Sequence, residues 1–130
     1  MEKKKILVVD DEKKIRDLLQ LRLSAAGYDV IEAKDGEEGV QQAKACLPDL
    51  ILMDVMMPKM DGAEATRCLE EDPATKDIPL IFLTSIITKE EEENQDMGIQ
   101  VAPGKHRFIA KPFEPQELLV EIENALEKKQ

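Results

Sequence analysis

Short apolar runs alternate with segments of helical spacing along the chain, and this alternation constrains the fold more than any other feature of the sequence. The runs are rich in aliphatic side chains, as in strands that are buried on both faces. They occupy residues 6–9, 28–33, 50–53, 80–83 and 107–110. Regular alternation of strands and helices predicts an α/β fold, in which a five-stranded parallel sheet carries helices on both faces.

The segments between these runs show helix start and stop signals. Asp35 and Glu38 have the spacing of a capping box ahead of the second helix, and Asp61 and Glu64 repeat that spacing ahead of the third. Gly27 is predicted to end the first helix. The expected apolar stripes of the first and last helices are Ile15, Leu18, Leu19, Leu23 and Ala26, and Leu118, Leu119, Ile122 and Leu126.

The bulk composition excludes several classes of protein. The chain has 130 residues, enough for one compact domain, and we expect residues 1–130 to form a single one. A formal net charge of -10 disfavours binding to nucleic acid or to anionic membranes, so a protein partner or a cation is expected instead. The apolar runs are too short to cross a bilayer, and no apolar signal segment follows the start MEKKK, so a cytoplasmic location is predicted. Cys46 and Cys68 have no CxxC spacing and are expected to be free thiols.

Polar side chains follow the predicted strands at their carboxyl ends, where open α/β sheets bind their ligands. These side chains are Asp10 and Asp11 after the first strand, Asp54 after the third, Thr84 and Ser85 after the fourth, and Lys111 after the fifth. If the first and third strands are neighbours, as in flavodoxin-like sheets, the three carboxylates converge at one edge.

Three carboxylates at close range repel one another, and a divalent cation removes that repulsion. Oxygen ligands of this kind suit Mg²⁺. Lys111 adds a positive charge and Thr84 a hydroxyl, so this edge could hold a phosphoryl group on Asp54, because carboxylates can act as nucleophiles that form an aspartyl phosphate.

With these residues the chain resembles the receiver domain of bacterial two-component response regulators, of the stand-alone type. The resemblance covers nearly the whole chain and is carried by the segments VVDDE, ILMDVMMPKMDG, LTS and FIAKPF. It implies a parallel sheet in the flavodoxin-like order 2-1-3-4-5 with helices on both faces.

The resemblance also implies a role for each matching residue. Asp54 would be the phosphoacceptor, and Mg²⁺ would be held by Asp10, Asp11, Asp54 and the backbone carbonyl of Met56, with Asp11 a direct ligand. Lys111 would pair with the acyl phosphate. Thr84 would move to bond a phosphoryl oxygen, and Phe108 would be the coupled aromatic switch. The implied partners are a histidine kinase or histidine phosphotransfer protein and a downstream target protein.

One departure from the family pattern lies between Thr84 and Lys111, in the segment TKEEEENQDMGIQVAPGKHR. Its acidic part has no apolar stripe, and four consecutive glutamates repel one another. We therefore expect a short, exposed or displaced fourth helix and a long loop over residues 88–104, less protected than the other helices.

Three other functions remain open at this point. The first is a Mg²⁺-dependent phosphatase with an aspartate nucleophile, although such enzymes usually place nucleophile and acid two residues apart after the first strand. The second is a flavin-binding module, although the segment DDEKK is acidic where a neutral, hydroxyl-rich phosphate loop would be expected. The third is a receiver-like module that never becomes phosphorylated, which the intact acidic set argues against.

Overall fold

The computed structural model of the protein describes residues 3–55, 60, 62–85, 107–111 and 113–127. All strands pair in parallel, and the sheet order is β2-β1-β3-β4-β5. The predicted α/β fold with strand order 2-1-3-4-5 is therefore confirmed. The strands are β1 (Lys5–Val9), β2 (Asp29–Ala33), β3 (Leu50–Asp54), β4 (Leu80–Ser85) and β5 (Arg107–Lys111), and the helices are α1 (Lys13–Ala25), α2 (Gly36–Cys46), α3 (Gly62–Glu71) and α5 (Pro115–Glu127).

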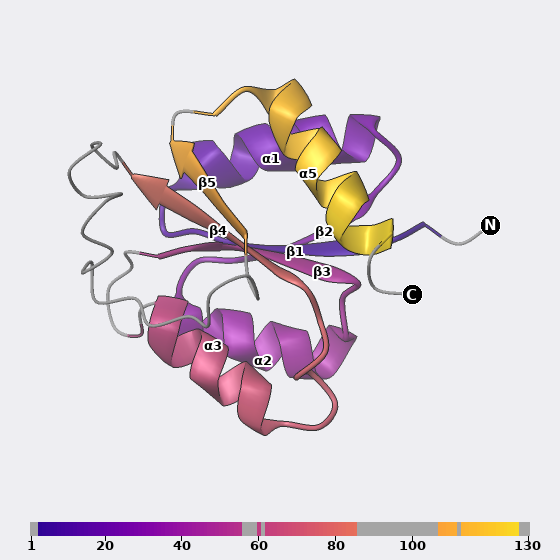
Figure 1. The fold of residues 1–130 in the computed structure, drawn as a ribbon. Helices are drawn as coiled ribbons and strands as arrows, with labels where there is room; N and C mark the ends of the chain where they lie inside the picture. The colour runs from indigo at the N-terminus through magenta and orange to yellow at the C-terminus, as the bar shows by residue number, and fades with distance from the viewer. Residues whose placement is uncertain (1–2, 56–59, 61, 86–106, 112, 128–130) are drawn as a thin grey trace.

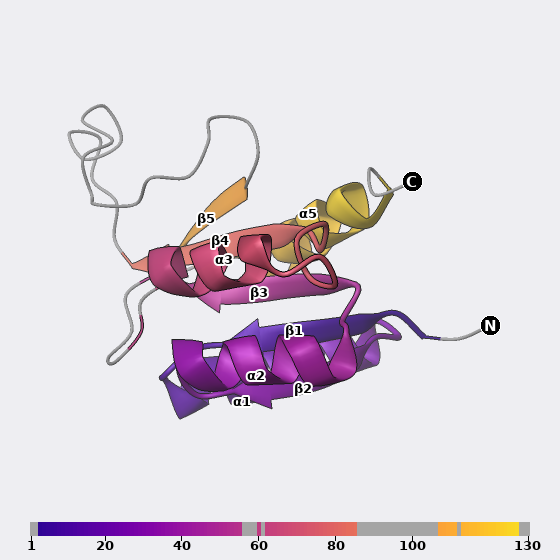
Figure 2. The same ribbon diagram turned by 90° about the horizontal axis from the view of Figure 1, so that it is seen from below.

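Helices cover the sheet on both faces. In Figure 1, α1 and α5 lie above the sheet, and α2 and α3 lie below it. Seen from below in Figure 2, α2 lies over β1 and β2, and α3 lies over β3 and β4. Because the predicted strand runs are apolar at nearly every position, each strand can supply side chains to both layers.

Two hydrophobic cores result from this arrangement, one on each face of the sheet. Alternate residues of β1 divide between them: Leu7 and Val9 pack with α2 and α3, whereas Ile6 and Val8 pack with α1 and α5. All four side chains are fully buried. The two cores enclose β1 and β3 on both faces, and this packing positions the carboxyl ends of the two strands.

The first helix ends where its glycine predicts. Gly27 has a φ of 97°, in the left-handed region that glycine adopts without strain. Leu19 and Leu23 are buried and Ile15 packs against the same core, as the predicted stripe requires. The inclusion of Ala26 in that stripe is wrong, because Ala26 is the C-cap residue and is exposed.

The second helix begins at the predicted cap. Asp35 accepts a hydrogen bond from the backbone N–H of Glu38 at 2.8 Å. The Glu38 carboxylate accepts from the N–H of Lys34, one residue before the position that a reciprocal capping box would use. The helix ends at Cys46, and its C-cap residue Leu47 has a left-handed φ of 48° although it is not glycine.

Several sequence predictions fall outside the described residues. They are the cap residue Asp61, the metal-ligating carbonyl of Met56 and the displaced fourth helix over 88–104. Cys46 and Cys68 are free and partly buried, as expected. Among the described helices, none is both long and apolar enough to span a membrane.

Candidate functional site

Strand register places the predicted polar residues at one edge of the sheet. Val9 pairs with Met53, so Asp10 and Asp54 follow side by side at the ends of β1 and β3. Ser85 pairs with Lys111 at the ends of β4 and β5. Four strands thus deliver their terminal residues to the same edge, as a parallel sheet requires.

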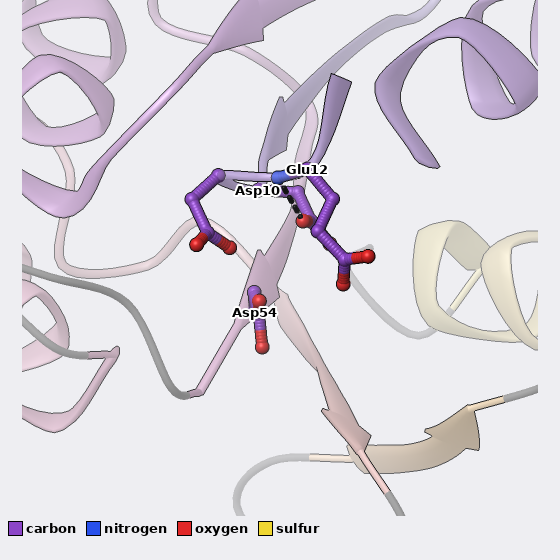
Figure 3. A group of neighbouring side chains, drawn as sticks. Asp10, Glu12 and Asp54 are labelled. Atoms are coloured by element: carbon purple, nitrogen blue, oxygen red, sulfur yellow. Dashed lines mark hydrogen bonds between the residues drawn. The ribbon is translucent and has the colours of Figure 1, made fainter. Parts of the chain in front are cut away.

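Four carboxylates gather at this edge, and we call them the acidic cluster: Asp10, Asp11, Glu12 and Asp54. Each offers an oxygen, and these oxygens all lie within 4.8 Å of one another. Asp10 and Asp54 are buried, whereas Asp11 and Glu12 are exposed. Figure 3 shows Asp10 and Glu12 from the segment after β1 gathered near Asp54.

Glu12 was not among the predicted site residues. It is the N-cap residue of α1, and its extended backbone turns the chain from β1 into the helix. That turn brings its carboxylate back to the strand end. The available sequence signal was the run of three consecutive acids in VVDDE.

Asp10 is fixed through each of its oxygens. Its Oδ1 accepts a hydrogen bond from the Glu12 N–H at 2.9 Å, drawn as a dashed line in Figure 3. Its Oδ2 accepts from Lys111 Nζ at 2.6 Å. Its backbone carbonyl accepts from Arg16 Nη1 at 2.7 Å. Since the residue is fully buried, these partners replace the water that a carboxylate would otherwise require.

Lys111 supplies the positive charge inside the acidic cluster. Its Nζ lies 2.6 Å from Asp10, 3.4 Å from Asp54 and 3.6 Å from Glu12, and its side chain is only 9% exposed. Burial lowers the pKa of this ammonium. The hydrogen bond to Asp10 and the charges of Asp10, Asp54 and Glu12 outweigh burial, and the pKa is raised above its ordinary value. Lys111 is therefore charged at neutral pH.

Among the residues that the structure describes, the charges at this edge do not balance. One ammonium lies among four carboxylates, which leaves an excess of negative charge in a partly buried site. Carboxylate oxygens without thiolate or imidazole ligands favour a hard cation of the Mg²⁺ type. The residues present therefore fit a magnesium ion.

Two other predicted residues lie on β4 and β5. Thr84 pairs with Ala110 in the sheet, and its side chain is outside the described residues. The ring of Phe108 stacks on that of Phe82, with centroids 5.3 Å apart, and Phe108 is 45% exposed. Phe108 thus connects the buried core to the surface of the edge strand β5.

Two glycines make close backbone contacts with Asp54 and Met60. A Cβ atom on Gly62 would lie 3.1 Å from the carbonyl oxygen of Asp54. A Cβ atom on Gly36, at the start of α2, would lie 2.3 Å from the carbonyl oxygen of Met60, closer than atoms can approach. The Gly36 contact therefore limits where Met60 can lie.

The chain matches the response regulator receiver domain over residues 6–123 and belongs to that family. It is a receiver of two-component signalling, and such domains generally act as signalling modules rather than as enzymes, with histidine kinases as their partners. Among curated relatives, it is 42% identical over 125 residues to the alkaline phosphatase synthesis transcriptional regulatory protein PhoP of Bacillus subtilis, covering 96% of this chain and 49% of the relative. It is 43% identical over 129 residues to the phosphate regulon transcriptional regulatory protein PhoB of Pseudomonas aeruginosa, covering 96% and 52%. The chain thus spans about half the length of these relatives.

Solved structures agree with this assignment. The Vibrio cholerae chemotaxis protein CheY4 superposes with a TM-score of 0.81 at 31% identity, over 95% of this chain and 99% of that chain. The receiver domain of the sensor histidine kinase PA1611 from Pseudomonas aeruginosa superposes with a TM-score of 0.83 at 28% identity, over 97% and 99%. That structure has a magnesium ion coordinated in its active site cleft.

Proposed function

We propose that the protein is a phosphorylation-dependent switch in which Asp54 accepts a phosphoryl group from a histidine kinase or a histidine phosphotransfer protein. Phosphorylation then changes its affinity for a downstream protein. The observation that carries this proposal is the placement of the Lys111 ammonium among the four carboxylates of the acidic cluster. This arrangement combines a carboxylate nucleophile with the positive charge that phosphoryl transfer needs.

Asp54 is the nucleophile of the proposed transfer. One carboxylate oxygen attacks the phosphorus of a phosphohistidine, so that an O–P bond forms, the P–N bond breaks, and the imidazole nitrogen leaves with the electron pair. Asp54 is buried at the end of β3, and β3 is paired with β1 on one side and β4 on the other. This packing holds the Asp54 carboxylate in position for the attack.

The proposed cation site uses three members of the acidic cluster and one backbone carbonyl. Mg²⁺ would be held by Asp10, Asp11, Asp54 and the backbone carbonyl of Met56, with Asp11 as a direct ligand. Both carboxylate oxygens of Asp10 already accept hydrogen bonds from the protein, which favours contact through water at that residue. The ion supplies charge stabilisation for the phosphoryl oxygens.

Lys111, Thr84 and Phe108 connect the phosphoryl group to the rest of the domain. Lys111 already lies 3.4 Å from Asp54 and would pair with the acyl phosphate. Thr84 would move to donate to a phosphoryl oxygen, and Phe108 would change its packing with it. Phosphorylation would shift the population between two conformations of the domain. We take residues 1–130 as one domain and the cytoplasm as its location.

Phosphorylation by a small donor tests the proposal. Incubation of the protein with acetyl phosphate and Mg²⁺ is expected to add one phosphoryl group to the intact mass, and chelation of Mg²⁺ is expected to prevent it. Release of inorganic phosphate from a simple aryl phosphate, without a stable adduct, would instead favour the phosphatase. Absence of any adduct with acetyl phosphate and with a phosphorylated histidine phosphotransfer protein would contradict the switch.

Lys111→Ala separates phosphoryl chemistry from cation binding. Removal of a positive charge beside the acidic cluster is expected to leave Mg²⁺ affinity unchanged or slightly higher. The rate of phosphorylation is expected to fall about 100-fold, as for loss of one group that stabilises a developing anion. Mg²⁺ titration and mass spectrometry measure the two effects, with Lys76→Ala as an exposed control. A tenfold loss of Mg²⁺ affinity in a folded variant would show that Lys111 has another role.

A further inference from the structure

Arg16 contacts the site from a position that the proposed chemistry does not use. It lies in the first turn of α1, and its side chain is 16% exposed. Its Nη1 donates to the backbone carbonyl of Asp10 at 2.7 Å. Its Nε lies 3.4 Å from Oε1 of Glu32, on the edge strand β2. One guanidinium therefore joins β2 to the residue that follows β1.

The carbonyl that Arg16 holds has a particular place in the chain. It belongs to the peptide group that joins Asp10 to Asp11, the two acids assigned to the cation. A peptide group is planar, so a hydrogen bond to its oxygen helps to fix the orientation of the plane. The position of the Asp11 Cα atom, which lies in that plane, is fixed with it. The Glu12 N–H fixes the Asp10 carboxylate, and Arg16 fixes the Asp10 main chain.

The chemistry of the guanidinium suits this task. Arginine presents several N–H donors in a rigid plane, so separate atoms can bind the carbonyl and the carboxylate at once. Glu32 offsets the positive charge of Arg16. Arg16 and Glu32 together thus hold the Asp10 main chain and add little net positive charge beside the proposed cation site. A lysine could make either contact, but not both in one fixed geometry.

We propose that Arg16, held by Glu32, is a positioning residue that fixes the Asp10–Asp11 peptide for cation binding. The proposal rests on the Mg²⁺ site of the proposed function. It makes a prediction opposite in sign to that of simple electrostatics. If Arg16 acted only as a nearby positive charge, its removal would strengthen Mg²⁺ binding. If it positions the peptide, its removal weakens Mg²⁺ binding.

The test is a Mg²⁺ titration of the whole chain without a phosphodonor. The backbone amide NMR shifts of residues near the acidic cluster report the binding. Arg16→Ala is expected to reduce Mg²⁺ affinity about tenfold, in the range seen when the outer partners of metal ligands are removed. Arg16→Lys retains the charge and is expected to lose part of the affinity. Arg22→Ala removes the same charge from an exposed position of the same helix and is expected to have no such effect.

Urea unfolding of each variant reports whether the fold is retained, and Arg16→Lys serves as the test if Arg16→Ala does not fold. Unchanged or tighter Mg²⁺ binding in the folded Arg16 variants would overturn the positioning role, as would absence of Mg²⁺ binding by the unaltered protein. The outcome is separable from that of the proposed function. Mg²⁺ binding that depends on Arg16, together with no phosphorylation of Asp54, would retain the positioning role and reject the switch.

Discussion

Asp54→Asn is expected to remove phosphorylation by acetyl phosphate entirely, while the fold is retained. Asparagine has nearly the same size as aspartate, so it fits the buried end of β3, but its amide is not a nucleophile at phosphorus. Intact mass should show one phosphoryl group on the unaltered protein in the presence of Mg²⁺ and none on the variant.

A matched control is available at the other end of the same strand. Asp49 directly precedes β3 and accepts a hydrogen bond from the Lys5 N–H at 2.8 Å, at the edge of the sheet opposite to the acidic cluster. Asp49→Asn keeps an acceptor oxygen and is expected to be labelled normally. Undiminished labelling of Asp54→Asn would move the acceptor to another residue, which peptide mapping would then locate.

Phe82→Ala is expected to cost about 3–5 kcal/mol in the free energy of unfolding, a large share of the stability of a domain of this size. Phe82 is fully buried in β4, within the core under α2 and α3. Its removal leaves a cavity in the core between the sheet and the helices α2 and α3, and takes away the ring on which Phe108 stacks.

Phe108→Ala is the matched control, because it deletes the same atoms from the other ring of the stack. Phe108 is 45% exposed, so less apolar surface returns to water, and we expect less than half of the cost. Urea unfolding, analysed with one m-value for all variants, measures the loss of unfolding free energy in each. Equal costs for the two variants would mean that Phe108 is more deeply packed than the structure shows.

The sheet was predictable because its strands carry a redundant signal. The apolar runs are short and alternate with segments of helical spacing, and this pattern is typical of a parallel sheet with two helical layers. The convergence of Asp10, Asp11 and Asp54 then follows from strand order, and it is observed. The roles assigned to these residues and to Lys111, Thr84, Phe108 and Met56 stay predictions.

The features that the sequence did not reveal depend on backbone geometry rather than on residue type. Glu12 joins the acidic cluster because an extended N-cap turns its side chain back toward the strand end. Arg16 looks like an ordinary polar residue of an amphipathic helix until β2 is placed beside α1. Leu47 takes a left-handed conformation that leucine rarely adopts, and the one available hint was the following Pro48, which disfavours helical geometry at the preceding residue.

The two glycines in the first half of α2 carry a lesson for protein engineering. Helix propensity alone would favour alanine at Gly36 and Gly39, with a gain of up to about 1 kcal/mol at each position. At Gly39 the added methyl group would meet the Val9 side chain at 2.9 Å, and at Gly36 it would meet the main chain of Met60 at 2.3 Å. Val9 is β-branched and fully buried, so it has little freedom to adjust, and at Gly36 a whole peptide group would have to move. A redesign that optimises α2 as an isolated helix would therefore force Val9 and Met60 out of place, and the resulting strain would oppose the gain in helix propensity.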